Sequence, residues 1–145
     1  MFKKILVPTD GSEVGHQAAA TAAQMASESG GQVVGVYVID PFPYIGIGDA
    51  SAVGLQAYLS DAKRVAGDAL DSVANACRAK NVPFAGDTIE RNLVWEGILE
   101  TAKAEGCDLI VMGSHGRQGV KALILGSVAQ KVLTHAHIPV LIVKG

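Results

Sequence analysis

Short runs of β-branched and aliphatic residues alternate along this chain with longer, Ala-rich stretches of helical period. This alternation constrains the fold most, because the strands of a parallel sheet are buried on both faces and need helical crossovers between them. It predicts one α/β domain, residues 1–145, in which an open Rossmann-like sheet of five parallel strands carries four helices on its two faces. The predicted strands span residues 4–8, 32–39, 84–91, 108–113 and 139–143, and the predicted helices span residues 12–30, 55–80, 94–106 and 126–134.

Local signals mark the ends of several elements. Ser12 is the expected N-cap of the first helix, because its hydroxyl can accept a hydrogen bond from a free amide of the first turn, and Gly30 is its expected end. Asn92 is the expected N-cap of the helix that carries Trp95. The spacing of Trp95 relative to other apolar residues of that helix indicates packing in the core or in an interface.

The pattern also places strands within the sheet. The strand at 32–39 is apolar on both faces, which predicts an internal position, whereas the more polar strand at 84–91 predicts an edge. Residues 40–54 hold two prolines and three of the glycines and follow no period. We expect them to form a mobile loop near the ligand-binding end of the sheet.

Composition excludes several classes of protein. The 145 residues are 49% hydrophobic and 18% charged, with a mean hydropathy of +0.30, which excludes a disordered chain. No apolar run approaches the length of a membrane-spanning helix, and the N-terminus lacks the pattern of a secretory signal. The net charge of −2, without a basic block, argues against nucleic-acid binding. Cys77 and Cys107 match no metal or redox spacing, so we expect buried thiols in a cytoplasmic protein.

The most informative turn follows the predicted fourth strand. There the chain reads Gly113-Ser114-His115-Gly116-Arg117, and Gly126-Ser127 opens a helix a few residues later. Glycines let backbone amides approach an anion, the N-terminus of a helix adds free amides and a favourable dipole, and Arg117 adds a positive charge. These features predict a phosphate cradle. The alternative is a glycine-rich turn that only connects two elements, since no Walker A sequence is present.

Other polar residues carry weaker signals. Ser114 and His115 are sequence neighbours without a Gly-x-Ser-x-Gly elbow, which favours a role in a ligand loop over a catalytic pair. His135 and His137 lack further ligands for a metal site and read as surface residues of a turn. Asp10 is the natural acceptor for a ribose hydroxyl or an adenine amino group. The alternative is a carboxylate that holds a turn or caps a helix, which is compatible with ligand contact.

The spacing Gly113-x2-Gly116-x9-Gly126-Ser127 resembles the G-2x-G-9x-G-[S/T] motif in the ATP-binding branch of the universal stress protein family. The segments 5–12, 37–40 and 138–144 are similar to that family's first strand and turn, second strand end and last strand. The resemblance thus covers the whole chain. It implies a parallel sheet of order 3-2-1-4-5 and a homodimer formed through the last strand, residues 138–143.

The resemblance also implies where a nucleotide would lie. Adenine is expected near Asp10 and Val38, and ribose near Pro8-Thr9 and Met112-Gly113. The phosphates are expected on Gly116, Arg117, Gly126, Ser127 and Val128. The expected cofactor is ATP, with ADP and AMP left open, and a divalent ion would be Mg²⁺ bridging the phosphates.

These residues predict an ATP-binding regulatory protein of the stress response, which acts as a nucleotide-dependent switch on a regulatory protein partner of unknown identity. The alternative is a slow ATPase or an autophosphorylating enzyme, which would need charge neutralisation at the γ-phosphate and a group that positions water or a hydroxyl. Arg117 and His115 are the available residues for those roles, and no carboxylate pair for a metal is evident. A scaffold without nucleotide binding is a third alternative, against which the intact glycine motif argues.

Overall fold

The computed structural model describes residues 2–41, 52–116 and 125–145. Strands and helices alternate along the chain, as the hydrophobic pattern predicts. The strands are β1 (Lys4–Pro8), β2 (Gln32–Ile39), β3 (Phe84–Glu90), β4 (Leu109–Gly113) and β5 (Val140–Val143), and the helices are α1 (Glu13–Ser29), α3 (Ala52–Ala79), α4 (Val94–Ala104) and α5 (Ser127–His135).

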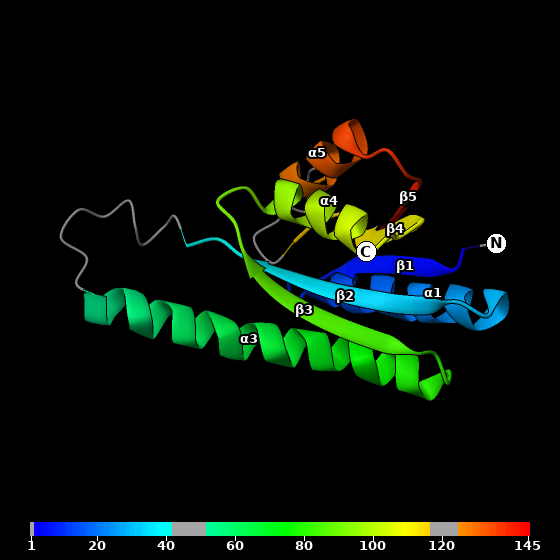
Figure 1. Cartoon of the computed structure of the whole chain (residues 1–145), viewed down its shortest axis with the longest axis horizontal. Coiled ribbons are helices and arrows are strands. Elements are labelled where there is room, and N and C mark those ends of the chain that lie inside the picture. The colour runs from blue at the N-terminus through cyan, green and yellow to red at the C-terminus, as the bar shows by residue number, and fades with distance from the viewer. Residues whose placement is uncertain (1, 42–51, 117–124) are drawn as a thin grey trace.

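The five strands form one parallel sheet of order β3-β2-β1-β4-β5 (Figure 1). This confirms the predicted fold class and strand order, including the internal place of β2 and the edge place of β3. The β1–β2 ladder reaches the pair Pro8 and Val36, whereas the β1–β4 ladder stops at Leu6 and Ile110. β1 and β4 therefore part before their carboxyl ends, at the point where the strand order reverses, which is where open α/β sheets bind ligands.

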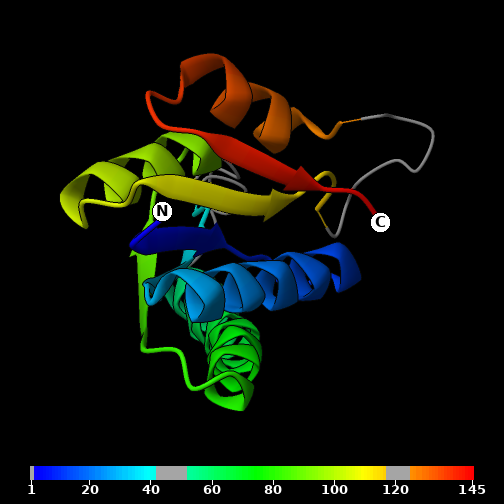
Figure 2. The same cartoon turned by 90° about the vertical axis from the view of Figure 1, so that its right-hand side faces the viewer.

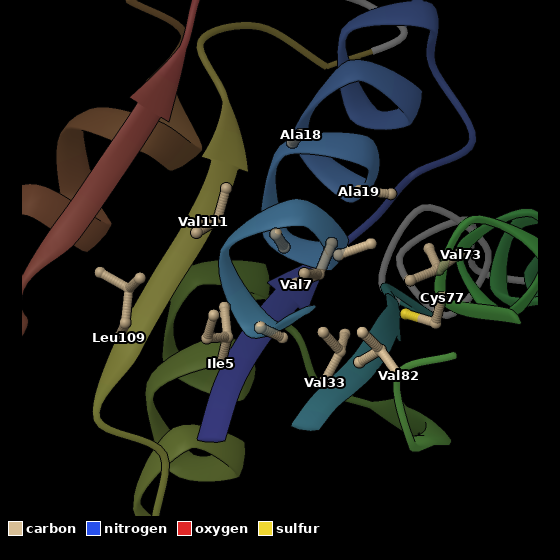
Figure 3. Packing of buried hydrophobic residues seen from close by; sticks show 13 residues of the cluster. Ile5, Val7, Ala18, Ala19, Val33, Val73, Cys77, Val82, Leu109 and Val111 are labelled. Atoms are coloured by element: carbon tan, nitrogen blue, oxygen red, sulfur yellow. The ribbon is translucent and has the colours of Figure 1, made fainter. Parts of the chain in front are cut away.

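Each face of the sheet is covered by one pair of helices, α1 with α3 and α4 with α5 (Figure 2). Figure 3 shows the core on the first face, to which Ile5 and Val7 of β1, Ala18 and Ala19 of α1, and Val73 and Cys77 of α3 belong. Alanines on the buried side of α1 allow this helix to lie close to the sheet. Those fully or almost fully buried alanines are Ala18, Ala19, Ala22, Ala23 and Ala26.

Two of the three predicted helix ends are confirmed. The amide of Gly15 donates to Ser12 Oγ at 3.1 Å, so Ser12 is the N-cap of α1, and Gly30 ends that helix with a φ of +69°. The prediction for Asn92 is wrong, because Leu93 occupies the N-cap position of α4 and makes no side-chain cap. The amide of Arg91 still donates to a β2 carbonyl at 3.0 Å, so the chain leaves the sheet too late for Asn92 to be the cap.

The predicted loop 40–54 lies largely outside the described residues. Its last residues belong to α3, which begins at Ala52 and not at the predicted Leu55, because the cost of Gly54 in a helix is only about 1 kcal/mol. The first turns of α3 extend past the carboxyl ends of β2 and β3 (Figure 1). The hydroxyl of Tyr58 donates to the carbonyl oxygen of Asp40 at 2.8 Å and thereby ties α3 to the end of β2.

The remaining apolar predictions concern the thiols and the single tryptophan. Cys77 and Cys107 are both free and buried, as expected of small core side chains. Trp95 packs against the core on the α4 and α5 face and stacks on His135, with ring centroids 4.6 Å apart. This confirms the packing role of Trp95. It also corrects the prediction for His135, which is the last residue of α5 and not part of a turn. Within residues 2–41, 52–116 and 125–145, no helix is long and apolar enough to cross a membrane.

Candidate functional site

A cleft of about 970 Å³ opens beyond the carboxyl ends of β1 and β4, where the ladder between them has stopped. Its walls come from the ends of β1, β2 and β4, the turns after β1 and β4, and the N-terminal parts of α1, α4 and α5. The lining residues are Pro8, Thr9, Asp10, Gly15, Val36, Tyr37, Val38, Val94, Ile98, Met112, Gly113, Ser114, His115, Gly116, Gly126, Ser127, Val128 and Ala129.

This cleft brings together ten of the eleven site residues assigned from the sequence, and the eleventh, Arg117, lies outside the described residues. It also includes Ser114 and His115. Sequence reasoning missed apolar residues such as Val94 and Ile98, because their spacing is that of an ordinary core-facing helix. The available signal was that α4 directly follows the carboxyl end of β3, on the ligand-binding side of the sheet.

The turn after β1 is held by bonds from its own side chains. The amide of Gly11 donates to Thr9 Oγ1 at 3.2 Å, and the amide of Ser12 donates to Asp10 Oδ1 at 3.0 Å. Gly11 has a φ of +81°, a left-handed conformation that favours glycine. One oxygen of Asp10 is therefore committed to the turn, as one of its two interpretations predicted, while the residue also lines the cleft.

The glycines of the motif in the turn after β4 are closely packed against other residues. Neither Gly113 nor Gly116 has a positive φ, so backbone conformation alone would accept another residue. A Cβ atom on Gly113 would lie 2.7 Å from Cγ1 of Val14, and a Cβ atom on Gly116 would lie 2.5 Å from Oδ2 of Asp10. Both positions are thus closely packed within the protein itself, against Val14 at Gly113 and against the end of the Asp10 side chain at Gly116.

The third motif glycine connects this turn to α5. The amide of Gly126 donates to the carbonyl oxygen of Ser114 at 2.7 Å, and a Cβ atom on Gly126 would lie 3.2 Å from that oxygen. The contact places the start of α5 beside the turn after β4, so Ser127 and Val128 line the cleft. The first amides of a helix have no acceptor within it and carry the positive end of its dipole, which suits an anion.

The other part of the cleft is apolar, with side chains from β2, β4, α4 and α5. These residues are Val36, Val38, Val94, Ile98, Met112 and Ala129. A planar heterocycle between such side chains would remove apolar surface from water, which is the main favourable term in binding such a group.

The peptide groups of Val38 add polar specificity to this wall. Alternate residues of a strand direct their peptide groups to the same neighbouring strand. The carbonyl of Val36 accepts from the amide of Thr9 at 2.9 Å, so the peptide groups of Val38 face the same side. The β1–β2 ladder ends at the pair Pro8 and Val36. The N–H and C=O of Val38 therefore face the cleft, as a donor beside an acceptor.

Ser114 and His115 form a hydrogen-bonded pair in the turn after β4. Oγ of Ser114 lies 3.1 Å from Nδ1 of His115, and Ser114 is 1% exposed. Nε2 of His115 is buried and has no hydrogen-bond partner in the part of the chain that the structure describes. In that same part, no group of three or more His, Cys, Asp or Glu residues is placed to hold a metal ion.

Comparison with known proteins places these features in a family context. The sequence profile of the Universal stress protein family matches residues 1–144. The universal stress protein MJ0531 of Methanocaldococcus jannaschii is 37% identical over 145 residues, which cover 99% of this chain and 83% of that protein.

Solved structures show the same fold. The structure of MJ0577, another universal stress protein of Methanocaldococcus jannaschii, matches with a TM-score of 0.86 and 27% identity, and the match covers 100% of this chain and 97% of that one. The universal stress protein of Archaeoglobus fulgidus in complex with dAMP matches with a TM-score of 0.69 and 21% identity, over 98% of each chain. At 21% identity, the match to the Archaeoglobus fulgidus protein shows a shared fold.

Proposed function

Because the chain belongs to the universal stress protein family, we propose that its cleft binds an adenine nucleotide, with ATP as the first candidate. In this proposal the nucleotide is a regulatory ligand in the stress response. One observation carries the proposal: an apolar wall and the N-terminus of α5 line a single cleft at the point where the strand order reverses. The apolar wall suits a base, and the N-terminus of α5 suits phosphates. The complex of the Archaeoglobus fulgidus protein with dAMP supports the choice of adenine.

In the proposed arrangement the adenine ring lies against the apolar wall and pairs with the peptide groups of Val38. The ribose lies between the Pro8-Thr9 turn and Met112, close to the carboxylate of Asp10. A carboxylate is a strong acceptor for ribose hydroxyls, and its fixed position in the turn reduces the ordering that binding requires.

The phosphates are proposed to rest on Gly116, Gly126, Ser127 and Val128, with Arg117 as a further contact. Asp10 is the one carboxylate among the described residues that line the cleft, so the chain offers few hard ligands of its own to a cation. Mg²⁺ is therefore proposed to reach the site with the nucleotide, coordinated by phosphate oxygens and water.

As a regulator, the protein would change partner or conformation according to whether the nucleotide is bound. A ligand acts in this way only by binding two conformations unequally. We place the protein in the cytoplasm, where both buried cysteines stay reduced and nucleotides are available. The regulatory partner is proposed to be a protein that distinguishes the two states.

We further propose that two copies pair through β5. This strand forms an edge of the sheet, and Leu141 is 37% exposed. The carbonyl of Pro139 accepts from Ile110 of β4, and the carbonyl of Val143 accepts from Ser114, directly after β4. By alternation, the peptide groups of Val140 and Ile142 face outward. An apolar edge with outward donors and acceptors is suited to pair with its copy across a two-fold axis.

The experiment that tests the proposed function joins two measurements on the full chain. Mass spectrometry of the small molecules released by acid identifies a co-purified ligand, and calorimetric titration with Mg-ATP and Mg-GTP measures affinity. The proposal predicts an adenine nucleotide in the first measurement or saturable binding of ATP in the second. A chain that carries no nucleotide and binds no added ATP contradicts it.

The same titration separates regulation from catalysis. Incubation with Mg-ATP followed by mass spectrometry shows whether ADP accumulates or the chain gains a phosphoryl group. The regulatory proposal predicts bound ATP that persists over the experiment. Stoichiometric turnover or a phosphorylated chain would favour the enzymatic alternative, for which Arg117 and His115 are the residues that the sequence offers.

A further inference from the structure

Gly97 of α4 packs closely against the side chain of Val38 near the end of β2. A Cβ atom on Gly97 would lie 3.0 Å from Cγ1 and 3.1 Å from Cγ2 of Val38. Ordinary contacts between carbon atoms are longer, at about 3.5–4.0 Å. Gly97 is buried inside a regular helix, where alanine is favoured over glycine by about 1 kcal/mol. The glycine therefore serves the contact between α4 and β2 and not the conformation of the helix.

Two neighbouring side chains confine this position. Both methyl groups of Val38 face Gly97, so any staggered rotation of the valine leaves one of them in place. On another side, Cγ of Arg91 would lie 3.2 Å from the same Cβ atom. The amide of Arg91 donates to the carbonyl of Ile39 at 3.0 Å, and its Nε donates to Glu100 of α4 at 2.8 Å. A methyl group on Gly97 would therefore push α4 and the end of β2 apart.

The same contact shapes the apolar wall of the cleft. Val94 and Ile98 of α4 line the cleft together with Val38 of β2. Residues three and four positions apart share one face of a helix, so Gly97 and Ile98 both adjoin Val94 on the face of α4 that meets the sheet. The separation of α4 from β2 at Gly97 therefore sets the spacing within the apolar wall. It also sets where the peptide groups of Val38 lie relative to that wall.

We propose that Gly97 is a positioning residue for recognition of the base. It allows α4 to rest on Val38 and thereby holds the apolar wall and the Val38 peptide groups at the spacing that an adenine ring requires. This assignment rests on the proposed nucleotide-binding function. Gly97 is not among the described residues that line the cleft, so it acts through Val38 and not through contact with a ligand. The proposed phosphate position lies on other elements, the turn after β4 and the start of α5.

The test is calorimetric titration of the full chain with AMP, ADP and ATP, comparing wild type with Gly97→Ala. We expect G97A to bind each of the three nucleotides about tenfold more weakly, because the added methyl group separates α4 from Val38. The loss should be the same factor for all three, because these ligands carry the same base and differ only in their phosphates.

A second substitution makes room for the methyl group from the side of the strand. Val38→Ala removes both methyl groups that face Gly97 and keeps the peptide groups of the strand. The substitution G97A should therefore weaken ATP binding less in the V38A background than in the wild type, which a double-mutant cycle measures. Gly67→Ala is the matched control and should bind all three nucleotides as the wild type does, because a Cβ atom on Gly67 would have nothing within 4 Å.

Several results would overturn the assignment. Equal affinities of G97A and wild type would exclude Gly97 from base recognition while the proposed function stood. A loss that grows with the number of phosphates, or an equal loss in the wild-type and V38A backgrounds, would show a general displacement of α4. Failure of both G97A and the double variant to fold would show that the collision with Val38 is not the cause. A wild-type chain that binds none of the three nucleotides would overturn the proposed function itself.

Discussion

Asp10 and Gly116 approach across the cleft from two turns that are far apart in the sequence. One carboxylate oxygen of Asp10 accepts from Ser12, and the other lies where a Cβ atom on Gly116 would come within 2.5 Å. Gly116 therefore has two proposed roles, one toward the carboxylate and one toward a phosphate. Substitution of Gly116 alone would disturb both.

A double-mutant cycle separates these two roles. Gly116→Ala should weaken ATP binding about tenfold or more, because the new methyl group collides with Asp10 and occupies the phosphate surface. Asp10→Ala removes the collision and a ribose acceptor. We expect the double variant to bind ATP more weakly than D10A alone, as measured by calorimetry. Equal affinities of D10A and the double variant would show that Gly116 serves only Asp10.

A matched glycine provides the control for this cycle. Gly67 lies in α3, and a Cβ atom at this position would have nothing within 4 Å, so Gly67→Ala adds a methyl group into open space. This variant should bind ATP like the wild type. It should also gain about 1 kcal/mol in the free energy of unfolding, because alanine is favoured over glycine inside a helix.

At the same scale, ionisation of the Cys107 thiol makes the free energy of unfolding depend on pH in the alkaline range. Burial raises the pKa of its thiol from 9.0 to about 11, the nearby Lys4 opposing the shift. A pKa that is higher in the folded state stabilises the fold below pH 9, and this contribution is lost as pH rises toward 11. The shift corresponds to on the order of 2 kcal/mol. Unfolding free energies between pH 8 and pH 10.5 should fall more steeply for wild type than for Cys107→Ala, and parallel slopes would contradict the assignment.

At the scale of elements, the sequence patterns locate strands better than they locate contacts between them. β1 and β2 begin and end where predicted, because Pro8 stops the first strand and the glycines after α1 precede the second. The Ala-rich period of α1 and its Ser12 cap likewise act within a few residues. Such local signals are readable from sequence because the interactions that enforce them are local.

The features that sequence reasoning missed depend on contacts across the sheet. The N-cap of α4 is Leu93 and not Asn92, and the amide of Arg91 still donates to Ile39 of β2, a contact that no local pattern records. Val94 and Ile98 line the cleft because α4 lies over the carboxyl end of the sheet. The unpartnered nitrogen of His115 is likewise a property of three-dimensional packing. The described residues of the predicted site share one cleft because they lie at the carboxyl ends of neighbouring strands and at the start of α5.

The N-cap of α1 offers a test of the local signals. Ser12→Ala removes the acceptor for the amide of Gly15 and should lower the free energy of unfolding by about 1 kcal/mol. Ser12→Asp keeps an acceptor and should stay close to wild type. Ser60 is exposed within α3, so Ser60→Ala is a control that should not destabilise. Urea unfolding followed by Trp95 fluorescence measures all three, and an unchanged midpoint for S12A would show that the cap does not stabilise α1.

At the scale of the whole molecule, the proposed dimer depends on outward peptide groups of β5. Val140→Pro removes an N–H that faces away from β4, at the first position of an edge strand, where proline is tolerated. We expect light scattering to show a dimer for wild type and a monomer for V140P. The dissociation follows from the loss of a bond across the two-fold axis.

The opposite edge supplies the matched control. The amide of Arg91 faces β2, so by alternation the peptide groups of Thr88 on β3 face outward as well. Thr88→Pro should leave the dimer intact. A monomeric wild type, or equal dissociation by both proline variants, would refute pairing through β5.

The central claim is that an adenine nucleotide occupies the cleft between the turns after β1 and β4. Its most direct test is the amide spectrum of isotope-labelled protein during titration with Mg-ATP. We predict saturable shifts that are largest at Val38, Gly116, Ser127 and Val128, residues that line the cleft from three separate elements. No shifts at millimolar Mg-ATP, or shifts confined to residues outside this cleft, would contradict it.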